Sequence, residues 1–178
     1  MKKWLLLLVS LGLFACDKDR DSFSMIPSEL PGTYWLESEY HIFKYENGKY
    51  VSYDLFDGDW DGGRGRSVLF FSSETSVVEF VSSSFVAEDR PQFYYKNCVF
   101  NYDADWKRLY TDMNTLGTDV PVVVELFTPG KIVLSFVGGE MELSKEKHVF
   151  IPYTPTEEWK RQAAQYPDYD DIDWSEVR

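Results

Sequence analysis

From Thr33 onward, apolar and polar residues alternate with a period of two along short runs of this chain. That period places successive side chains on opposite faces of a β-strand, whereas an amphipathic helix needs a period near 3.6. Turn residues separate the runs: Asn47-Gly48 suits a tight hairpin, and Pro129-Gly130 suits a turn between two strands. Short strands with turns at regular spacing predict an all-β barrel or sandwich.

The predicted strands are residues 34–42, 50–56, 68–71, 77–81, 93–102, 106–111, 122–127, 132–137, 141–143 and 149–151. In the first of them, strict alternation assigns two faces. The residues expected on one face are Tyr34, Leu36, Tyr40 and Ile42, and those expected on the other are Glu37, Glu39 and His41.

One helix is predicted, close to the C-terminus. The segment Thr154-Pro155-Thr156-Glu157 has the Thr-x-x-Glu spacing of a capping box, with proline at the first helical position. Trp159, Ala163 and Tyr166 line one face, and Pro167 ends the helix. We expect Trp159 and Tyr166 to pack against the strands or over one end of the sheet.

The first sixteen residues have the layout of an export signal. Lys2 and Lys3 precede the apolar run 4–14, and a small residue, Ala15, stands before Cys16. The apolar run is too short to cross a bilayer as a helix. A cysteine directly after the small residue resembles the bacterial lipobox, which implies cleavage before Cys16 and lipidation of its side chain.

These features divide the chain into four expected parts. Residues 1–15 are the lipoprotein signal peptide, and residues 16–28 are a flexible tether, because a polar and charged segment buries too little apolar surface to fold. Residues 29–166 form the β-domain with its helix, and residues 167–178 form an acidic tail. Lys18-Asp19 partly resembles the surface-export signal of Bacteroidetes lipoproteins. The expected location is therefore the bacterial cell envelope, as an outer-membrane lipoprotein on the cell surface or the periplasmic face.

The net charge of −12 limits the partners of the chain. Nucleic-acid binding draws on clustered lysine and arginine, so we expect no nucleic-acid partner. Direct adhesion to anionic lipid is disfavoured for the same reason, and membrane attachment should come from the acyl chains on Cys16. The only cysteine beyond Cys16 is Cys98, which is predicted to pack as a small apolar side chain.

Two short motifs carry a resemblance to a known superfamily. Leu30-Pro31-Gly32-Thr33-Tyr34-Trp35 resembles the Gly-x-Trp start of the lipocalins, and Tyr110-Thr111-Asp112-Met113 is similar to their Thr-Asp-Tyr segment. The chain also resembles the small lipocalin-like lipoproteins of the Bacteroidetes. The resemblance implies an antiparallel up-and-down barrel of roughly eight to ten strands with one C-terminal helix, a fold that can enclose a ligand.

A calcium-binding loop is one hypothesis for the segment that follows the second predicted strand. Asp57, Asp59 and Asp61 alternate before Gly62, as in the first half of a Ca²⁺ loop, where oxygen ligands converge in one turn. Val68 stands where the bidentate glutamate would be needed. The alternative is a glycine-rich hairpin loop with solvated aspartates. No other cofactor is expected.

Motifs of catalysis are absent from the sequence. It contains no Gly-x-Ser-x-Gly, no His-Glu-x-x-His and no phosphate-binding loop, so we expect a protein that is not an enzyme. His41 and His148 lie on different predicted strands without zinc-ligand spacing around them, and a rim or outer-face position is expected for both.

Aromatic residues make up 17% of the chain and supply the candidates for ligand binding. At the mouth of a barrel such rings can stack on sugars or cover a lipid, whereas buried rings are simply core. The candidate ligand-binding residues are Trp35, Tyr53, Tyr95 and Trp106.

Three functions remain open at this stage. The favoured one is a lipid-anchored, non-catalytic envelope protein that binds a small apolar or saccharide ligand, or a partner protein. The second is a structural or adhesive subunit that docks an envelope partner through its acidic loop and tail, with or without Ca²⁺. The third is an envelope hydrolase that uses two carboxylates.

Overall fold

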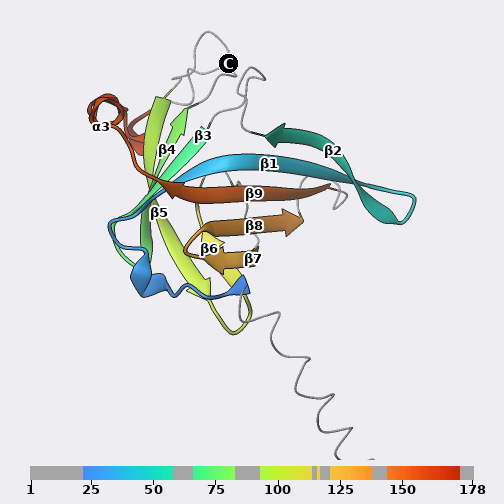
Figure 1. Cartoon of the computed structure of the whole chain (residues 1–178). Coiled ribbons are helices and arrows are strands. Elements are labelled where there is room, and N and C mark those ends of the chain that lie inside the picture. The colour runs from blue at the N-terminus through green and yellow to red at the C-terminus, as the bar shows by residue number, and fades with distance from the viewer. Residues whose placement is uncertain are drawn as a thin grey trace, which may run out of the picture.

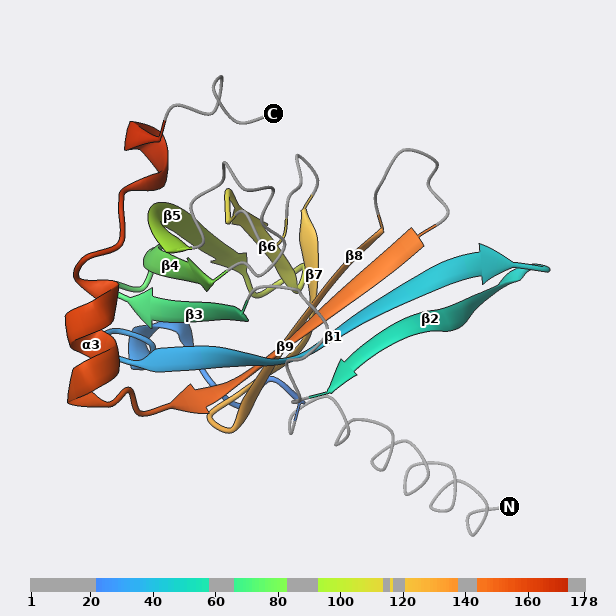
Figure 2. The same cartoon turned by 90° about the horizontal axis from the view of Figure 1, so that it is seen from above.

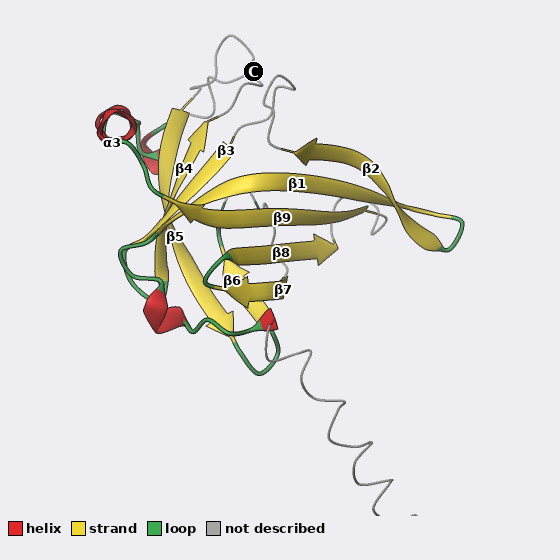
Figure 3. Ribbon diagram, viewed as in Figure 1, coloured by secondary structure: helices red, strands yellow, loops and turns green. Residues whose placement is uncertain are grey.

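The computed structural model describes residues 22–57, 66–82, 93–113, 116, 121–137 and 144–172. Within these residues nine strands form one antiparallel sheet, which curls into a barrel (Figures 1 and 3). The strands are β1 (Tyr34–Glu46), β2 (Lys49–Asp57), β3 (Arg66–Phe71), β4 (Ser76–Ser82), β5 (Phe93–Asp103), β6 (Arg108–Thr111), β7 (Val122–Thr128), β8 (Lys131–Val137) and β9 (Ser144–Tyr153).

Pairing between the first and last strands closes the barrel. Along the sheet the order is β2-β1-β3-β4-β5-β6-β7-β8-β9, and β1 also pairs with β9. Eight strands therefore form the closed wall, while β2 pairs with the distal part of β1 (Figure 2). This confirms the predicted all-β antiparallel barrel of the lipocalin-like kind.

The hairpin between β1 and β2 turns at Asn47 and Gly48, as predicted. Both residues have positive φ angles, 51° and 82°, which a two-residue turn of this kind requires. Figures 1 and 2 show this hairpin extending beyond the barrel.

Two strand predictions need correction. The predicted strand 149–151 is part of the longer β9, and residues 141–143 lie outside the described residues. The predicted strand 106–111 begins only at Arg108, because the turn after β5 includes Trp106 and Lys107, and Lys107 has a φ of 50°.

A β-bulge in β1 overturns the predicted assignment of its faces. Glu37 pairs with Phe150, but the next paired residue is Glu39, opposite Val149, so Ser38 is the extra residue. The alternation is shifted by one beyond this point. Glu37 and Tyr40 consequently both face the interior, although strict alternation assigned them to opposite faces.

An apolar core fills one end of the barrel. Its largest buried side chains include Phe71, Phe100, Phe127 and Phe150. The segment before β1 crosses this end: Met25 N donates to Phe127 O (3.1 Å), and Gly32 N donates to Phe71 O (2.8 Å). We call this closed end the floor.

The folded part of the chain begins earlier than predicted. Met25 lies in the segment predicted to be a tether, yet it is only 5% exposed and belongs to the core. Its apolar side chain and its backbone bond to β7 hold it on the floor. The segment that can act as a tether therefore ends before Met25.

The C-terminal helix α3 (Glu157–Ala163) packs on the outer wall of the barrel. This is one of the two positions predicted for it, against the strands. The Trp159 ring meets Tyr34, Phe80 and Tyr153 edge-on, with centroid distances of 5.3–6.2 Å. The N-cap of α3 is Thr156, whose hydroxyl accepts from Trp159 N, so the cap predicted at Thr154 is wrong. Among the described residues, none of the helices has the length and apolar character that spanning a membrane requires.

The first residues of the acidic tail pack against β5. Tyr95 N donates to Pro167 O (3.0 Å), and a parallel bridge joins Tyr95 to Asp168. The short 3-10 helix η2 (Tyr169–Asp171) follows, and the Tyr169 ring contacts Tyr94. The tail thus extends the wall where β5 has lost its pairing with the short β6.

A charged cluster on the outer wall links β7, β8 and β9. Glu125 Oε1 accepts from Lys145 Nζ (2.7 Å) and from Ser135 Oγ (2.9 Å), and Glu125 Oε2 lies 2.7 Å from Lys147 Nζ. Burial alone would raise the pKa of Glu125, but these three hydrogen bonds outweigh it and lower the pKa to about 2.

This shift predicts a contribution of Glu125 to stability that depends on pH. The folded-state pKa lies below the ordinary value of 4.5, so the contribution is complete above pH 4.5 and is lost as the pH falls towards 2. Glu125→Gln should lower the urea midpoint at pH 7, and the difference from wild type should shrink by pH 3. Glu74→Gln, in the exposed turn after β3, should leave the midpoint unchanged at both pH values. A difference for Glu125→Gln that is equal at both pH values would contradict the prediction.

Candidate functional site

Polar side chains occupy the half of the barrel interior opposite the floor. Ser67 and Glu146 lie near the starts of β3 and β9, whereas the floor lies near the ends of these strands. We call this set the interior polar band. Its members are Glu37, Tyr40, Ser67, Glu79, Glu146 and His148.

A buried pair forms the centre of the band. Glu37 and His148 are 4% and 1% exposed, and His148 Nδ1 lies 2.7 Å from Glu37 Oε1. The second oxygen, Glu37 Oε2, accepts from Ser67 N at 3.3 Å. Because a carboxylate oxygen can only accept, Nδ1 carries a proton and donates it to this bond.

The network continues from this pair across β3 and β4. Ser67 Oγ donates to Glu79 Oε1 at 3.2 Å, and Glu79 is fully buried. Glu79 is paired with Lys96 in the register of β4 and β5, and paired antiparallel residues point to the same face. The polar band therefore reaches Lys96 on the neighbouring strand.

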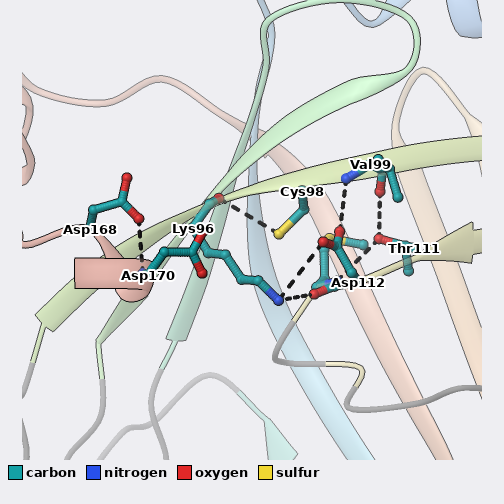
Figure 4. Close-up of polar contacts among 8 residues, drawn as sticks. Lys96, Cys98, Val99, Thr111, Asp112, Asp168 and Asp170 are labelled. Carbon is teal, nitrogen blue, oxygen red and sulfur yellow. Dashed lines mark hydrogen bonds and ion pairs between the residues drawn. The ribbon is translucent and has the colours of Figure 1, made fainter. Parts of the chain in front are cut away.

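Lys96 and Asp112 form hydrogen bonds beside β5 at the point where β6 ends (Figure 4). Lys96 Nζ donates to Asp112 O at 2.6 Å. Val99 N donates to Asp112 Oδ1 (2.8 Å), and Thr111 Oγ1 donates to Val99 O (2.6 Å). Side chains thus satisfy backbone groups of β5 for which β6 has no further partner.

On the side of the imidazole away from Glu37, His148 Nε2 is buried and has no hydrogen-bond partner among the described residues. Glu146 Oε2 lies 4.0 Å away, beyond hydrogen-bond distance, and accepts from the Tyr40 hydroxyl. The rings of Tyr40 and Phe136 pack against the imidazole, at centroid distances of 4.7 and 5.9 Å. An unpaired buried nitrogen is costly, so it is the least satisfied atom of the band.

Cys98 lies in the core beside the band, as its predicted packing requires. Its Sγ lies 3.6 Å from Lys96 O, which it contacts as a weak donor. Burial raises the pKa of the thiol far above its usual range, and the charges of Glu79 and Asp112 add to this effect. The thiol therefore stays protonated and has little nucleophilic character.

The structure separates the aromatic residues predicted to bind a ligand. Trp35 is buried in the core, and its Nε1 donates to Thr33 Oγ1 at 2.9 Å. Tyr95 lies on the outer face of β5, where a hydrogen bond to Asp168 raises the pKa of its hydroxyl. Trp106 is 75% exposed in the turn after β5. Trp35 in the core, Tyr95 on the outer face and Trp106 in an exposed turn do not form one site.

Tyr53, the fourth of these residues, lies in β2 where the pairing register with β1 shifts between Ile42 and Phe43. Asp57 is the last residue of the same strand, and Asp59 and Asp61 lie outside the described residues. Within the described part of the chain, no three His, Cys, Asp or Glu side chains are placed to share a metal ion. The calcium loop stays a prediction.

The predicted surface position of the two histidines is wrong for His148. His41 does lie on the outer face, 3.0 Å from Glu39, but His148 lies inside the barrel because it pairs with Leu134 of the core. Sequence analysis missed the pair with Glu37 altogether. The one local signal was that His148 alternates with Phe150, which placed a polar residue on an apolar face.

Comparison with protein-family models, with curated proteins and with solved structures finds no match to this chain. The geometry of the interior polar band is therefore the main indication of function in this chain.

The buried pair predicts a large and face-specific effect of mutation. Glu37→Ala leaves His148 Nδ1 and Ser67 N without their acceptor, and each buried donor left without a partner costs about 1 to 3 kcal/mol. Urea unfolding should report a loss of this size. Glu39→Ala, on the outer face of the same strand, should change stability by no more than about 0.5 kcal/mol. Equal effects of the two substitutions would contradict the assigned faces.

Proposed function

We propose that this protein is a lipid-anchored envelope protein that binds a small polar ligand in the half of its barrel opposite the floor, which we call the mouth. The observation that carries the proposal is the interior polar band, and above all the unpartnered Nε2 of the buried His148. A barrel that served only as a packed scaffold would gain stability from an apolar interior throughout, because unsatisfied buried polar groups are destabilising.

Exposure decreases from the mouth inwards. The side chain of Glu146 is 26% exposed, that of His148 only 1%, and the apolar core lies beyond. A ligand that enters at the mouth would meet Glu146 first and the imidazole edge next. This order supports a polar ligand, and of the two classes predicted from the sequence it favours saccharides over apolar molecules.

The position of the N-terminal segment supports a lipid anchor at Cys16. Met25 lies on the floor, and eight residues separate it from Cys16. A segment of that length spans at most about 30 Å. An anchor there would hold the floor near the membrane and leave the mouth directed away from it.

Proton-transfer catalysis is the second candidate function. A carboxylate that orients an imidazole through Nδ1, with Nε2 left free, is also the arrangement of a general base. Among the described residues, Nε2 contacts no hydroxyl or thiol that could act as a nucleophile. Binding is therefore the better-supported function, and turnover of a bound probe would favour catalysis.

The lipid anchor is tested by removing its attachment point. Cys16→Ala should move the protein from the membrane fraction to the soluble fraction, because the acyl chains are the only attachment we propose. Cys98→Ala should remain with the membranes. Sedimentation, together with mass spectrometry of the N-terminal peptide, measures both. A Cys16→Ala variant that still sediments, with no lipid mass on the wild type, would overturn the anchor.

Ligand binding is tested with a panel of neutral oligosaccharides, porphyrins and fatty acids. Amide and side-chain NMR shifts should change at Tyr40, Glu146 and His148 on addition of a polar ligand, and fatty acids should give no such change. Trp106→Phe, outside the barrel, should leave the binding unchanged. If neither this panel nor a set of amines shifts the signals of the polar band, the proposed function is overturned.

A further inference from the structure

The atoms that the polar band leaves open are hydrogen-bond acceptors. Since Nδ1 of His148 donates to Glu37, Nε2 is the ring nitrogen that carries the lone pair of the imidazole. Glu146 uses Oε2 to accept from Tyr40, and among the described residues its Oε1 has no partner. A ligand group that satisfies both residues must donate at least two hydrogen bonds.

The charges of the band favour a cation. Three carboxylates, Glu37, Glu79 and Glu146, face the interior. Lys96 lies on the same face, but its Nζ donates to the backbone oxygen of Asp112 at 2.6 Å and lies 4.0 Å from the Asp112 carboxylate. Lys44 follows Tyr40 on the same face of β1, further out towards the hairpin. The net charge of −12 would also raise the rate of encounter with a cation.

Aromatic rings border the two open acceptors. Tyr40 and Phe136 lie on the imidazole of His148, and the Tyr40 hydroxyl reaches Glu146. Ring faces attract cations and exclude water, and both effects strengthen a charged hydrogen bond to the carboxylate. Among the described residues no three side chains can share a metal ion, so an organic cation fits the site better than a metal does.

We propose that the ligand carries a primary ammonium group, which binds between Glu146 Oε1 and His148 Nε2 beside the ring of Tyr40. Its N–H groups donate to the carboxylate and to the imidazole lone pair. This inference rests on the proposed function, since it names the chemical class of the ligand at the same mouth. The hydrogen bond to Glu37 fixes the imidazole of His148, and the imidazole orients the ammonium group of the ligand. Glu146 supplies the negative charge.

The test compares amines with alcohols of the same shape. Isothermal titration of the full-length protein in detergent would use benzylamine against benzyl alcohol, and glucosamine against glucose. Each amine should bind at least tenfold more tightly than its alcohol, and raising the salt concentration should reduce this preference. Alcohols that bind as tightly as the amines would overturn the ammonium proposal while leaving the binding function intact.

Matched variants locate the effect. Glu146→Gln keeps an acceptor for Tyr40 but loses the charge, and it should abolish the tenfold preference for the amines. Glu39→Gln removes a charge from the outer face of β1, which pairs with β9, and this variant should preserve the preference for the amines. Unchanged urea midpoints would show that each variant is folded.

Two outcomes separate this inference from the proposed function. If amines bind but Glu146→Gln retains their preference, the ammonium site lies elsewhere and the inference is overturned. If neither these probes nor any member of the oligosaccharide, porphyrin and fatty-acid panel binds, the proposed function itself is overturned.

Discussion

The pairing of β1 with β9 is the constraint on which the rest of the structure depends. Strand β1 is long enough to pair with β9 along most of its length, with β3 at its start and with β2 at its end. Closure removes the free edges that an open sheet would expose. The bulge at Ser38 lies within this seam and shifts the alternation of faces. Both Glu37 and Tyr40 thereby point inwards, so the seam that closes the barrel also creates its polar interior.

Different interactions stabilise the two halves of the barrel interior. Near the floor, buried phenylalanines and Leu30 release apolar surface from water, which is the main source of stability in a domain without a disulfide among its described residues. Towards the mouth, buried carboxylates are tolerated only because His148, Ser67 and backbone groups bond to them. The unpaired Nε2 is the exception, and such exceptions concentrate at functional sites.

Elements distant in sequence complete the wall around this interior. Strand β6 is too short to pair with the whole of β5, and the carboxylate of Asp112 satisfies Val99 N in its place. Residues from the acidic tail pair with Tyr95 on the same strand. Helix α3 covers the outer aromatic face through Trp159. The tail and the helix thus pack against the wall beside the polar band.

The sequence by itself determined the fold class, the positions of most strands, the Asn47-Gly48 turn and the presence of one C-terminal helix, because alternation, turn chemistry and helical periodicity act over a few residues. It did not reveal the site. The bulge at Ser38 depends on the register with β9, and Glu37 meets His148 across 111 residues of sequence. Of the candidate residues chosen for their aromatic rings, Trp35 lies in the core and Trp106 in an exposed turn. Local patterns specify which residues form strands, whereas only tertiary closure decides which polar side chains share the interior, since that choice is made by pairing between strands far apart in the chain.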